Sequence, residues 1–199
     1  IITDIDPVEE KTGKPNKDGE PTTTLVAVAN IGQAGLQCGN PTLRGWHPKL
    51  QKLDDFKNPT EVQLVSKEVA ECLVRFAWQL PVAEAGDHWP STFEDSLILT
   101  NMPWFTGLMD EKVDGDGKKI KPPKGALGSV ARQVADHAKV PDLLGALHKL
   151  MHDSFNKGDF AASIFEMVAT EEPVACPKYI ADALEWLQTQ LEPNPDLML

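Results

Sequence analysis

The chain has 199 residues, of which 41% are hydrophobic and 25% are charged, and this composition excludes a disordered polypeptide. A length of this order suits one domain, or one domain with a smaller lobe. The formal net charge of −11 argues against a protein that binds DNA through its own lysines, because phosphate binding usually depends on basic residues.

The three cysteines are widely spaced and form no CxxC pair, which is the usage of a cytoplasmic protein. No apolar run is long enough to cross a bilayer, so we expect no contact with a membrane. The chain opens on Ile1 and Ile2 without a methionine. This start resembles the inside of a strand, and we expect the sequence to be part of a longer polypeptide.

The first third of the chain is predicted to alternate between extended and irregular segments. Residues 1–6 are predicted to form a short buried strand, because their isoleucines are β-branched. This strand is expected to stop at Pro7. Residues 9–23 are charged and contain glycine and proline, which predicts a loop. An extended segment over residues 22–29 follows. Asn40 and Pro41 predict the start of a short helix, since Asn caps helices and Pro suits their first position.

The middle of the chain is predicted to contain a helix over 61–70, a strand over 72–80 and a loop over 81–91. Ser91 or Thr92 then caps a helix that runs to about Thr100, with acids in its first turn, where the helix dipole favours them. Residues 110–125 form a surface loop. Beyond it, apolar residues at helical spacing predict a lobe of helices only.

Strands that alternate with helices predict an α/β fold with parallel strands flanked by helices, followed by an additional C-terminal helical lobe. We expect the first domain to cover residues 1–109 and the helical lobe to cover 110–199.

Asp4 and Asp6 are the first candidates for a metal site. Two acids at alternate positions of a strand point to the same side, and acids placed close together repel each other unless a cation lies between them. Carboxylate oxygens suit Mg²⁺ or Mn²⁺. The alternative is a plain loop with solvated acids.

Several segments of the chain resemble one family in the same order. They are Ile1-Ile2-Thr3-Asp4-Ile5-Asp6, Cys38-Gly39-Asn40 with the short helix to Trp46, Val74-Arg75-Phe76-Ala77-Trp78-Gln79, Thr92-Phe93-Glu94, Lys157-Gly158-Asp159-Phe160-Ala161, Pro177-Lys178-Tyr179-Ile180 and Leu184-Glu185-Trp186-Leu187. Together they are similar to the Toprim part of the OLD-family (overcoming lysogenization defect) nucleases. In that family a Toprim nuclease follows an ATPase domain, so the resemblance implies a Toprim-like parallel sheet and an upstream ATPase domain in the same polypeptide.

The chain departs from the family pattern in two ways. The family's first Toprim acid, a glutamate, would lie upstream of Ile1 and is absent from this sequence. Residues 110–155 look like an extra helical insertion between the matched segments.

The resemblance assigns roles to Glu94 and Lys157. It implies that Glu94 is a third metal ligand, whereas the residue pattern alone favours a capping-box acid three residues after Ser91. It implies that Lys157 stabilises charge on the phosphate, whereas a lysine at a helix start is ordinarily a solvated surface residue. Two interpretations are also open for Trp46: its ring could stack on a nucleic-acid base or pack inside the protein. Packing is the simpler interpretation.

The leading hypothesis is a divalent-metal-dependent DNA endonuclease that uses two Mg²⁺ or Mn²⁺ ions held by Asp4, Asp6 and Glu94. Its partners would be DNA, the upstream ATPase domain and, in a homodimer, a second copy. One alternative is a nucleic-acid-binding or regulatory Toprim module that does not cleave. Another is a Toprim protein of primase or topoisomerase type, against which the C-terminal segments argue.

Overall fold

The computed structural model describes residues 1–15, 17, 20–27, 35–46, 52–60, 64–69, 72–113, 115–153, 155–170 and 172–191. The chain forms two compact units. Unit 1 consists of Ile1–Val28, Gln33–Pro81 and Cys176–Leu199, and unit 2 consists of Ala29–Gly32 and Val82–Ala175. This division differs from the boundary expected after residue 109, because the C-terminal segment belongs to the same unit as the N-terminus.

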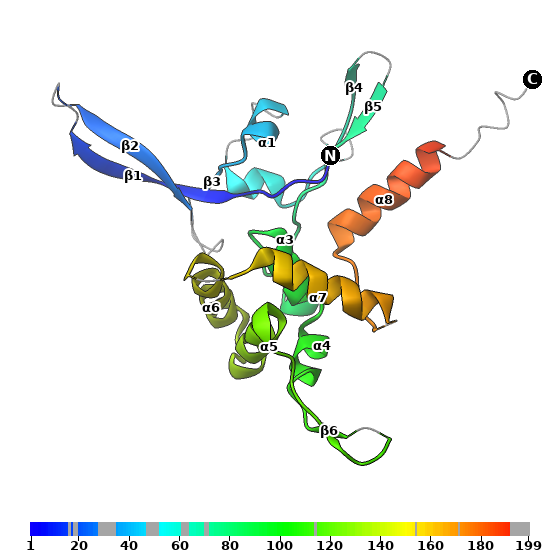
Figure 1. Ribbon diagram of the computed structural model, residues 1–199. Helices are drawn as coiled ribbons and strands as arrows, with labels where there is room; N and C mark the ends of the chain where they lie inside the picture. Colours follow the sequence, from blue (N-terminus) through cyan, green and yellow to red (C-terminus); the bar gives the residue numbers. More distant parts are fainter. Residues whose placement is uncertain are drawn as a thin grey trace, which may run out of the picture. The chain divides into compact units, whose positions relative to one another are not determined.

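The sheet of unit 1 is antiparallel and has the strand order β2-β1-β3. Its strands are β1 (Pro7–Pro15), β2 (Pro21–Ala27) and β3 (Gln37–Cys38), and β1 and β2 form a long hairpin (Figure 1). The extended segment expected from residue 22 is confirmed as far as Ala27. The loop expected over 9–23 is wrong at residues 9–15 and 21–23, because threonines and valines suit a paired strand, while residues 16, 18 and 19 lie outside the described part. The prolines lie at the hairpin's end, where Pro15 is opposite Pro21.

A second hairpin in unit 1 joins β4 (Val65–Val69) to β5 (Cys72–Arg75). The helix expected over 61–70 is therefore wrong from residue 65, while residues 61–63 and 70 lie outside the described part. Pairing with β5 outweighs the helical pattern of this segment, since strand preference depends on the neighbouring strand.

The N-terminus of the chain pairs in parallel with the segment that follows β5. The Ala77 N–H donates to the Ile1 carbonyl at 2.9 Å, and the Thr3 N–H donates to the Ala77 carbonyl at 3.0 Å. The buried strand expected over residues 1–6 is present only as this short parallel pairing, and Ile5 is buried whereas Ile1 and Ile2 are 60% and 47% exposed.

The remaining elements of unit 1 are α1 (Pro41–Trp46), the 3₁₀ helix η1 (Leu53–Phe56) and α8 (Lys178–Leu191). The interior of the unit includes an edge-to-face pair of Phe56 and Trp78, and the Trp78 indole N–H donates to the Phe56 carbonyl at 2.9 Å. Its other fully buried apolar side chains include Ile5, Leu43 and Phe76.

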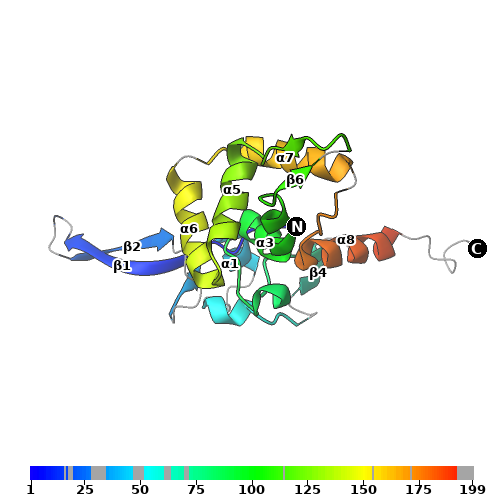
Figure 2. The ribbon, with the colours of Figure 1, turned by 90° about the horizontal axis from the view of Figure 1, so that it is seen from below.

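Unit 2 is mainly helical, as expected. It contains η2 (Ala83–Ala85), α3 (Phe93–Thr100), α4 (Met102–Gly107), α5 (Gly125–Asp136), α6 (Val140–Asp153) and α7 (Lys157–Ala169). Helix α5 contacts α4, α6 and α7, and Figure 2 shows α5 and α6 side by side. Apolar side chains of these helices form one core, which includes Ile98, Phe105, Val130, Leu147 and Phe160. The expected surface loop contains an exposed hairpin of β6 (Lys112–Val113) and β7 (Lys119–Ile120).

The fold thus mixes α-helices with small sheets. In the described part of the chain the three sheets are antiparallel, and parallel pairing is limited to the N-terminal segment against the segment that follows β5. None of the described helices is both long and apolar enough to cross a membrane.

Candidate metal centre

Asp4 and Asp6 lie where the parallel pairing ends and β1 begins. Ile5 between them is fully buried, while Asp4 is half-buried and Asp6 is exposed. The backbone of Asp6 has a φ of 48°, in the left-handed region that Asp tolerates better than most residues. The chain therefore turns at Asp6, with the apolar side chain between the two acids anchored inside the unit.

Gln79 holds this loop from the inside of unit 1. Its side chain is fully buried, and its amide Nε2 donates a hydrogen bond to Oδ1 of Asp4. Its Oε1 accepts a hydrogen bond from the Ile5 N–H at 2.9 Å. The backbone ladder with Ala77 ends at Thr3, so the Gln79 side chain supplies the acceptor that the neighbouring strand no longer provides.

Asn40 holds the same loop from the start of α1. Its Oδ1 accepts from two backbone N–H groups of the helix, at 2.9 and 3.2 Å, which confirms the expected N-cap. Its Nδ2 lies 2.6 Å from the Asp4 carbonyl, 2.8 Å from Oγ1 of Thr3 and 3.4 Å from Oδ2 of Asp6. One side chain therefore caps the helix and ties it to the acidic loop.

Gly39 allows β3 to approach the acidic loop closely. Its N–H donates to the Asp6 carbonyl at 2.7 Å, and a Cβ on this residue would lie only 2.6 Å from the same oxygen. The neighbouring Cys38 is buried, and its thiol donates to the Ile5 carbonyl at 3.2 Å. Burial raises the pKa of the Cys38 thiol, so the group remains protonated and acts as a structural donor.

Glu94 lies in the first turn of α3, in unit 2. The Thr92 hydroxyl caps this helix by accepting from the Asp95 N–H at 3.2 Å, as expected. The Ser91 hydroxyl and N–H donate to Oδ2 of Asp95 at 2.5 and 3.3 Å. The acid that accepts hydrogen bonds from the segment before α3 is therefore Asp95, and Glu94 pairs with Lys157 instead of taking the capping role that the sequence pattern favoured.

The buried Asp95 makes a prediction about stability and pH. Burial raises the pKa of this carboxyl above its ordinary value, so folding favours the protonated form. Its contribution to stability is complete below the unfolded pKa and is lost as the pH rises through the folded pKa. We expect the free energy of unfolding of wild type to fall relative to that of Asp95→Asn as the pH rises from 3 to 7. Urea unfolding of both proteins measures the two free energies of unfolding. A wild-type value that rises relative to that of Asp95→Asn over this pH range would contradict the prediction.

Lys157 is the first residue of α7, where a helix dipole favours acids over bases. The Asn156 side chain caps this helix by accepting from the Asp159 N–H at 3.0 Å. The Asp159 carboxylate in turn accepts from the Ala126 N–H at 3.0 Å, which ties the start of α7 to the start of α5. The lysine is thus held at a helix end that does not itself stabilise a positive charge.

Lys157 and Glu94 form an ion pair in unit 2, with Nζ 2.9 Å from Oε1. The side chain of Glu94 is 11% exposed and that of Lys157 is 61% exposed. In the described part of the chain, Oε2 of Glu94 is buried without a hydrogen-bond partner. Buried carboxylate oxygens normally have partners, so this oxygen fits a role as acceptor for a cation or a donor group.

The structure therefore groups the four predicted site residues as two pairs. Asp4 and Asp6 belong to unit 1, and Glu94 and Lys157 belong to unit 2. Within the described residues, no group of three or more His, Cys, Asp or Glu side chains gathers closely enough to hold a metal ion. The oxygen donors of Asp4 and Asp6 nevertheless fit a hard divalent cation.

A hollow of about 530 Å³ adjoins the Glu94–Lys157 pair within unit 2. Its remaining walls are apolar and come from the starts of α3 and α7 and from one face of α7; they include Phe93, Phe160 and Phe165. The ion pair is therefore the charged part of an otherwise apolar surface.

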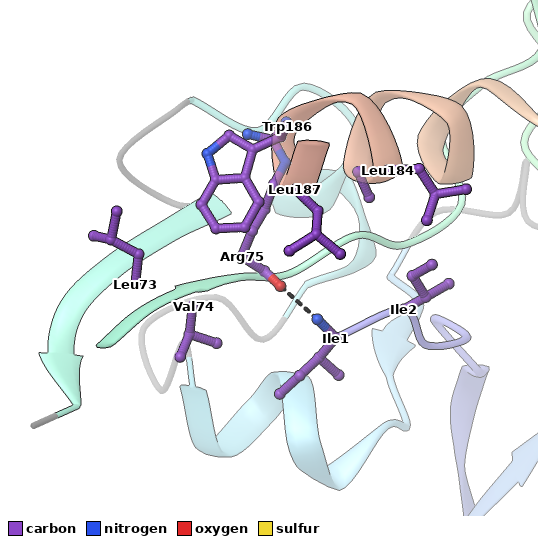
Figure 3. A pocket seen from close by; sticks show the side chains of 9 residues that line it. Ile1, Ile2, Leu73, Val74, Arg75, Leu184, Trp186 and Leu187 are labelled. Atoms are coloured by element: carbon purple, nitrogen blue, oxygen red, sulfur yellow. Dashed lines mark hydrogen bonds between the residues drawn. The ribbon is translucent and has the colours of Figure 1, made fainter. Parts of the chain in front are cut away.

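A second hollow, of about 260 Å³, lies in unit 1 between the N-terminal residues, β5 and α8 (Figure 3). The Ile1 nitrogen donates to the Arg75 carbonyl at 2.6 Å, and the Arg75 guanidinium lies 5.7 Å from the ring centre of Trp186. The other walls are leucine, isoleucine, valine and alanine side chains, without a carboxylate. This hollow therefore lacks the donors that a metal site needs.

The packing interpretation of Trp46 is supported, because its ring centre lies 4.3 Å from that of Phe76. Phe105 is fully buried in the core of unit 2.

Comparison of the chain with protein-family models, with curated proteins and with solved structures found no match. The site is therefore interpreted from its own geometry. Sequence reasoning did not assign the bonding roles of Gln79 and Asn40 around Asp4 and Asp6. A signal for Gln79 is present, because it is a polar residue directly after an apolar run and two residues before Pro81.

Proposed function

We propose that this chain is the nuclease part of a divalent-metal-dependent DNA endonuclease, with Asp4 and Asp6 as the central metal ligands. One observation carries the proposal: two buried amides, those of Gln79 and Asn40, hold a short loop that presents two acids. Gln79 is fully buried and Asn40 is 7% exposed. Fixing polar side chains in this way suits a site whose ligands must keep one orientation.

Each of the four candidate site residues has its own part in the proposed reaction. Asp4 and Asp6 would hold one or two Mg²⁺ or Mn²⁺ ions, with Glu94 proposed from the resemblance as a third ligand; among the described residues its buried Oε2 has no hydrogen-bond partner. Bound divalent ions would lower the pKa of a water molecule and neutralise charge on the phosphate. Lys157 presents its ammonium group to the phosphate, where positive charge stabilises the transition state. Its exposed side chain at the start of α7 is accessible to a phosphate.

The proposal extends to the fold and the partners. The proposed sheet is a Toprim-like parallel sheet, with which the parallel pairing of Ile2 and Ala77 is compatible. The proposed partners are DNA, an upstream ATPase domain and a second copy of the chain. The net charge of −11 means that DNA binding would depend on metal ions and on basic residues outside this chain.

Nicking of supercoiled plasmid tests the proposal. We expect the protein to nick plasmid with Mg²⁺ or Mn²⁺ and to be inactive with EDTA, because the acids need cations to approach a phosphate. Agarose gels of time courses with Mg²⁺, Mn²⁺, Ca²⁺ or EDTA measure this.

The alternative is a nucleic-acid-binding or regulatory module that does not cleave. It is favoured by the observation that no third acid gathers with Asp4 and Asp6 in the described part of the chain. DNA affinity that is equal with and without Mg²⁺, together with no cleavage by the folded protein in any metal, would support this alternative over the nuclease.

A further inference from the structure

We infer that the hollow beside Glu94 and Lys157 in unit 2 binds an unpaired DNA base that carries an amino group. The inference rests on the proposed function, because it takes DNA as the ligand and Lys157 as the residue that faces a phosphate. It goes further by assigning a site to the base next to that phosphate. It also gives Glu94 a partner on the base instead of a metal ion, which leaves Asp4 and Asp6 as the metal ligands.

The hollow has the size and the walls of a ligand site. Its volume of about 530 Å³ lies within the range of roughly 300–1,000 Å³ that is typical of small-molecule sites. Phe93 and Phe165 belong to its wall, and both are exposed although water disfavours exposed apolar rings. Bases of single-stranded nucleic acids stack on aromatic side chains largely irrespective of sequence. The two rings therefore offer a stacking surface to a base that has left its pair.

Glu94 supplies a buried acceptor at the wall of this hollow. The residue is 8% exposed, and within the described part of the chain its Oε2 is buried without a hydrogen-bond partner. Leaving a buried polar atom without a partner is costly, so a ligand that donates to it is favoured. Because Oε1 already contacts Nζ of Lys157, one oxygen remains for a ligand, and it suits the N–H of an amino group.

The surroundings of Glu94 favour an amino group over a metal ion at this oxygen. Among the described residues that line the hollow, Glu94 alone carries a carboxylate, and apart from Lys157 the other side chains are apolar. The Lys157 ammonium lies 2.9 Å from the same carboxylate and would repel a second cation placed beside it. A neutral amino group meets no such repulsion.

Lys157 connects the hollow to the DNA backbone. Its side chain is 61% exposed and lines the hollow together with Glu94. In the proposed function its ammonium faces a phosphate, so the base attached to the neighbouring sugar would enter the hollow once it is unpaired. Unpairing costs least where the strand is already single or mismatched. The site is therefore expected to select single-stranded DNA.

Fluorescence anisotropy of two labelled oligonucleotides in EDTA tests the inference without relying on cleavage. Each is a short strand of abasic sites with one base at its centre, which is adenine in one probe and unsubstituted purine, without the amino group, in the other. The two probes carry the same phosphates, so repulsion by the acidic chain cancels in the ratio of their dissociation constants. We expect wild type to bind the adenine probe at least about tenfold more tightly, as is typical of a hydrogen bond to a charged group.

Two variants separate the acceptor from the stacking surface. Glu94→Met keeps the length of the side chain and should bind both probes equally. Phe165→Ala should weaken both probes by the same factor, about fivefold or more, because stacking does not need the amino group. Glu166→Met is the matched control, since Glu166 is an exposed acid of α7 outside the residues that line the hollow. The control should keep the wild-type preference for adenine.

The outcomes distinguish this inference from the proposed function. A preference for adenine that is lost in Glu94→Met and kept in Glu166→Met supports the base site, even if no metal ion produces nicking of plasmid. Equal binding of both probes by wild type, or binding of neither, overturns the base site even if plasmid is nicked with Mg²⁺. A preference that survives in folded Glu94→Met overturns the role of this acid. If Glu94→Met does not fold, the wild-type ratio and the effect of Phe165→Ala decide the test.

Competition with unlabelled dAMP separates a base within DNA from a free nucleotide. We expect dAMP to displace the adenine probe less efficiently than the unlabelled oligonucleotide does, because it lacks the neighbouring backbone. Equal displacement by the two competitors would assign the hollow to free nucleotides and overturn DNA as its ligand.

Discussion

Replacing Asp4 and Asp6 together by asparagine is expected to lower metal-dependent nicking of plasmid DNA by about a thousandfold or more. Bound cations contribute several kcal/mol of charge stabilisation in the transition state, and about 1.4 kcal/mol corresponds to a factor of ten in rate. Asparagine retains the size of the side chain and can still accept a hydrogen bond. The loss should therefore come from the missing charge, and initial rates of plasmid nicking in Mn²⁺ measure it.

A matched control separates the site from the general loss of negative charge. Asp136 and Asp153 are exposed acids near the ends of α5 and α6, and Asp136→Asn, Asp153→Asn changes the net charge by the same amount. The control protein should nick at the wild-type rate. Cleavage that survives in the Asp4, Asp6 variant, or that falls equally in the control, would remove these two acids from the proposed centre.

The helical half of the chain could be predicted from sequence because its signals are local. The Thr92 cap and the Asn40 cap follow from residue types next to apolar periodicity, and both are present as hydrogen bonds. The apolar stripes predict the helices but not which of their residues are covered, since Leu147 and Phe160 are buried whereas Phe165 is exposed. Such signals need only a few neighbouring residues, so distant parts of the chain do not alter them.

The hairpins could not be predicted in the same way because they depend on pairing between segments. The charged residues of β1 look like a loop until β2 is placed beside them. Residues 65–69 have a helical pattern, and only their pairing with β5, from Val65 opposite Arg75 to Val69 opposite Cys72, makes them a strand. Tertiary pairing outweighs the local preference in both places.

The candidate site was partly visible in the sequence. Asp4 and Asp6 stand out because two acids follow an apolar segment, and Glu94 and Lys157 were singled out through the resemblance. The contact of Gln79 with Asp4 spans 75 residues, and the ion pair of Lys157 with Glu94 spans 63, so spacing could not predict either one. A local sequence pattern does not identify which distant side chain completes the hydrogen bonds of a given acid.

Replacing Phe160 by alanine is expected to destabilise the protein by about 3–5 kcal/mol, the usual cost of removing a buried phenylalanine side chain. Phe160 is 2% exposed and contacts the rings of Phe105 and Phe155, with ring centres 6.3 and 5.3 Å away. It belongs to the first turn of α7, where the Asn156 cap and Lys157 also lie. Urea unfolding at 25 °C measures the free energy of unfolding.

Phe165→Ala is the matched control for this variant, because it makes the same change on the same helix. Phe165 is 75% exposed, so its loss should change the free energy of unfolding by less than about 0.5 kcal/mol. An equal cost for the two variants would mean that the apolar face of α7 is covered in solution. A large cost for Phe160→Ala alone would show that the core of unit 2 holds the start of α7, and with it Lys157, against α5.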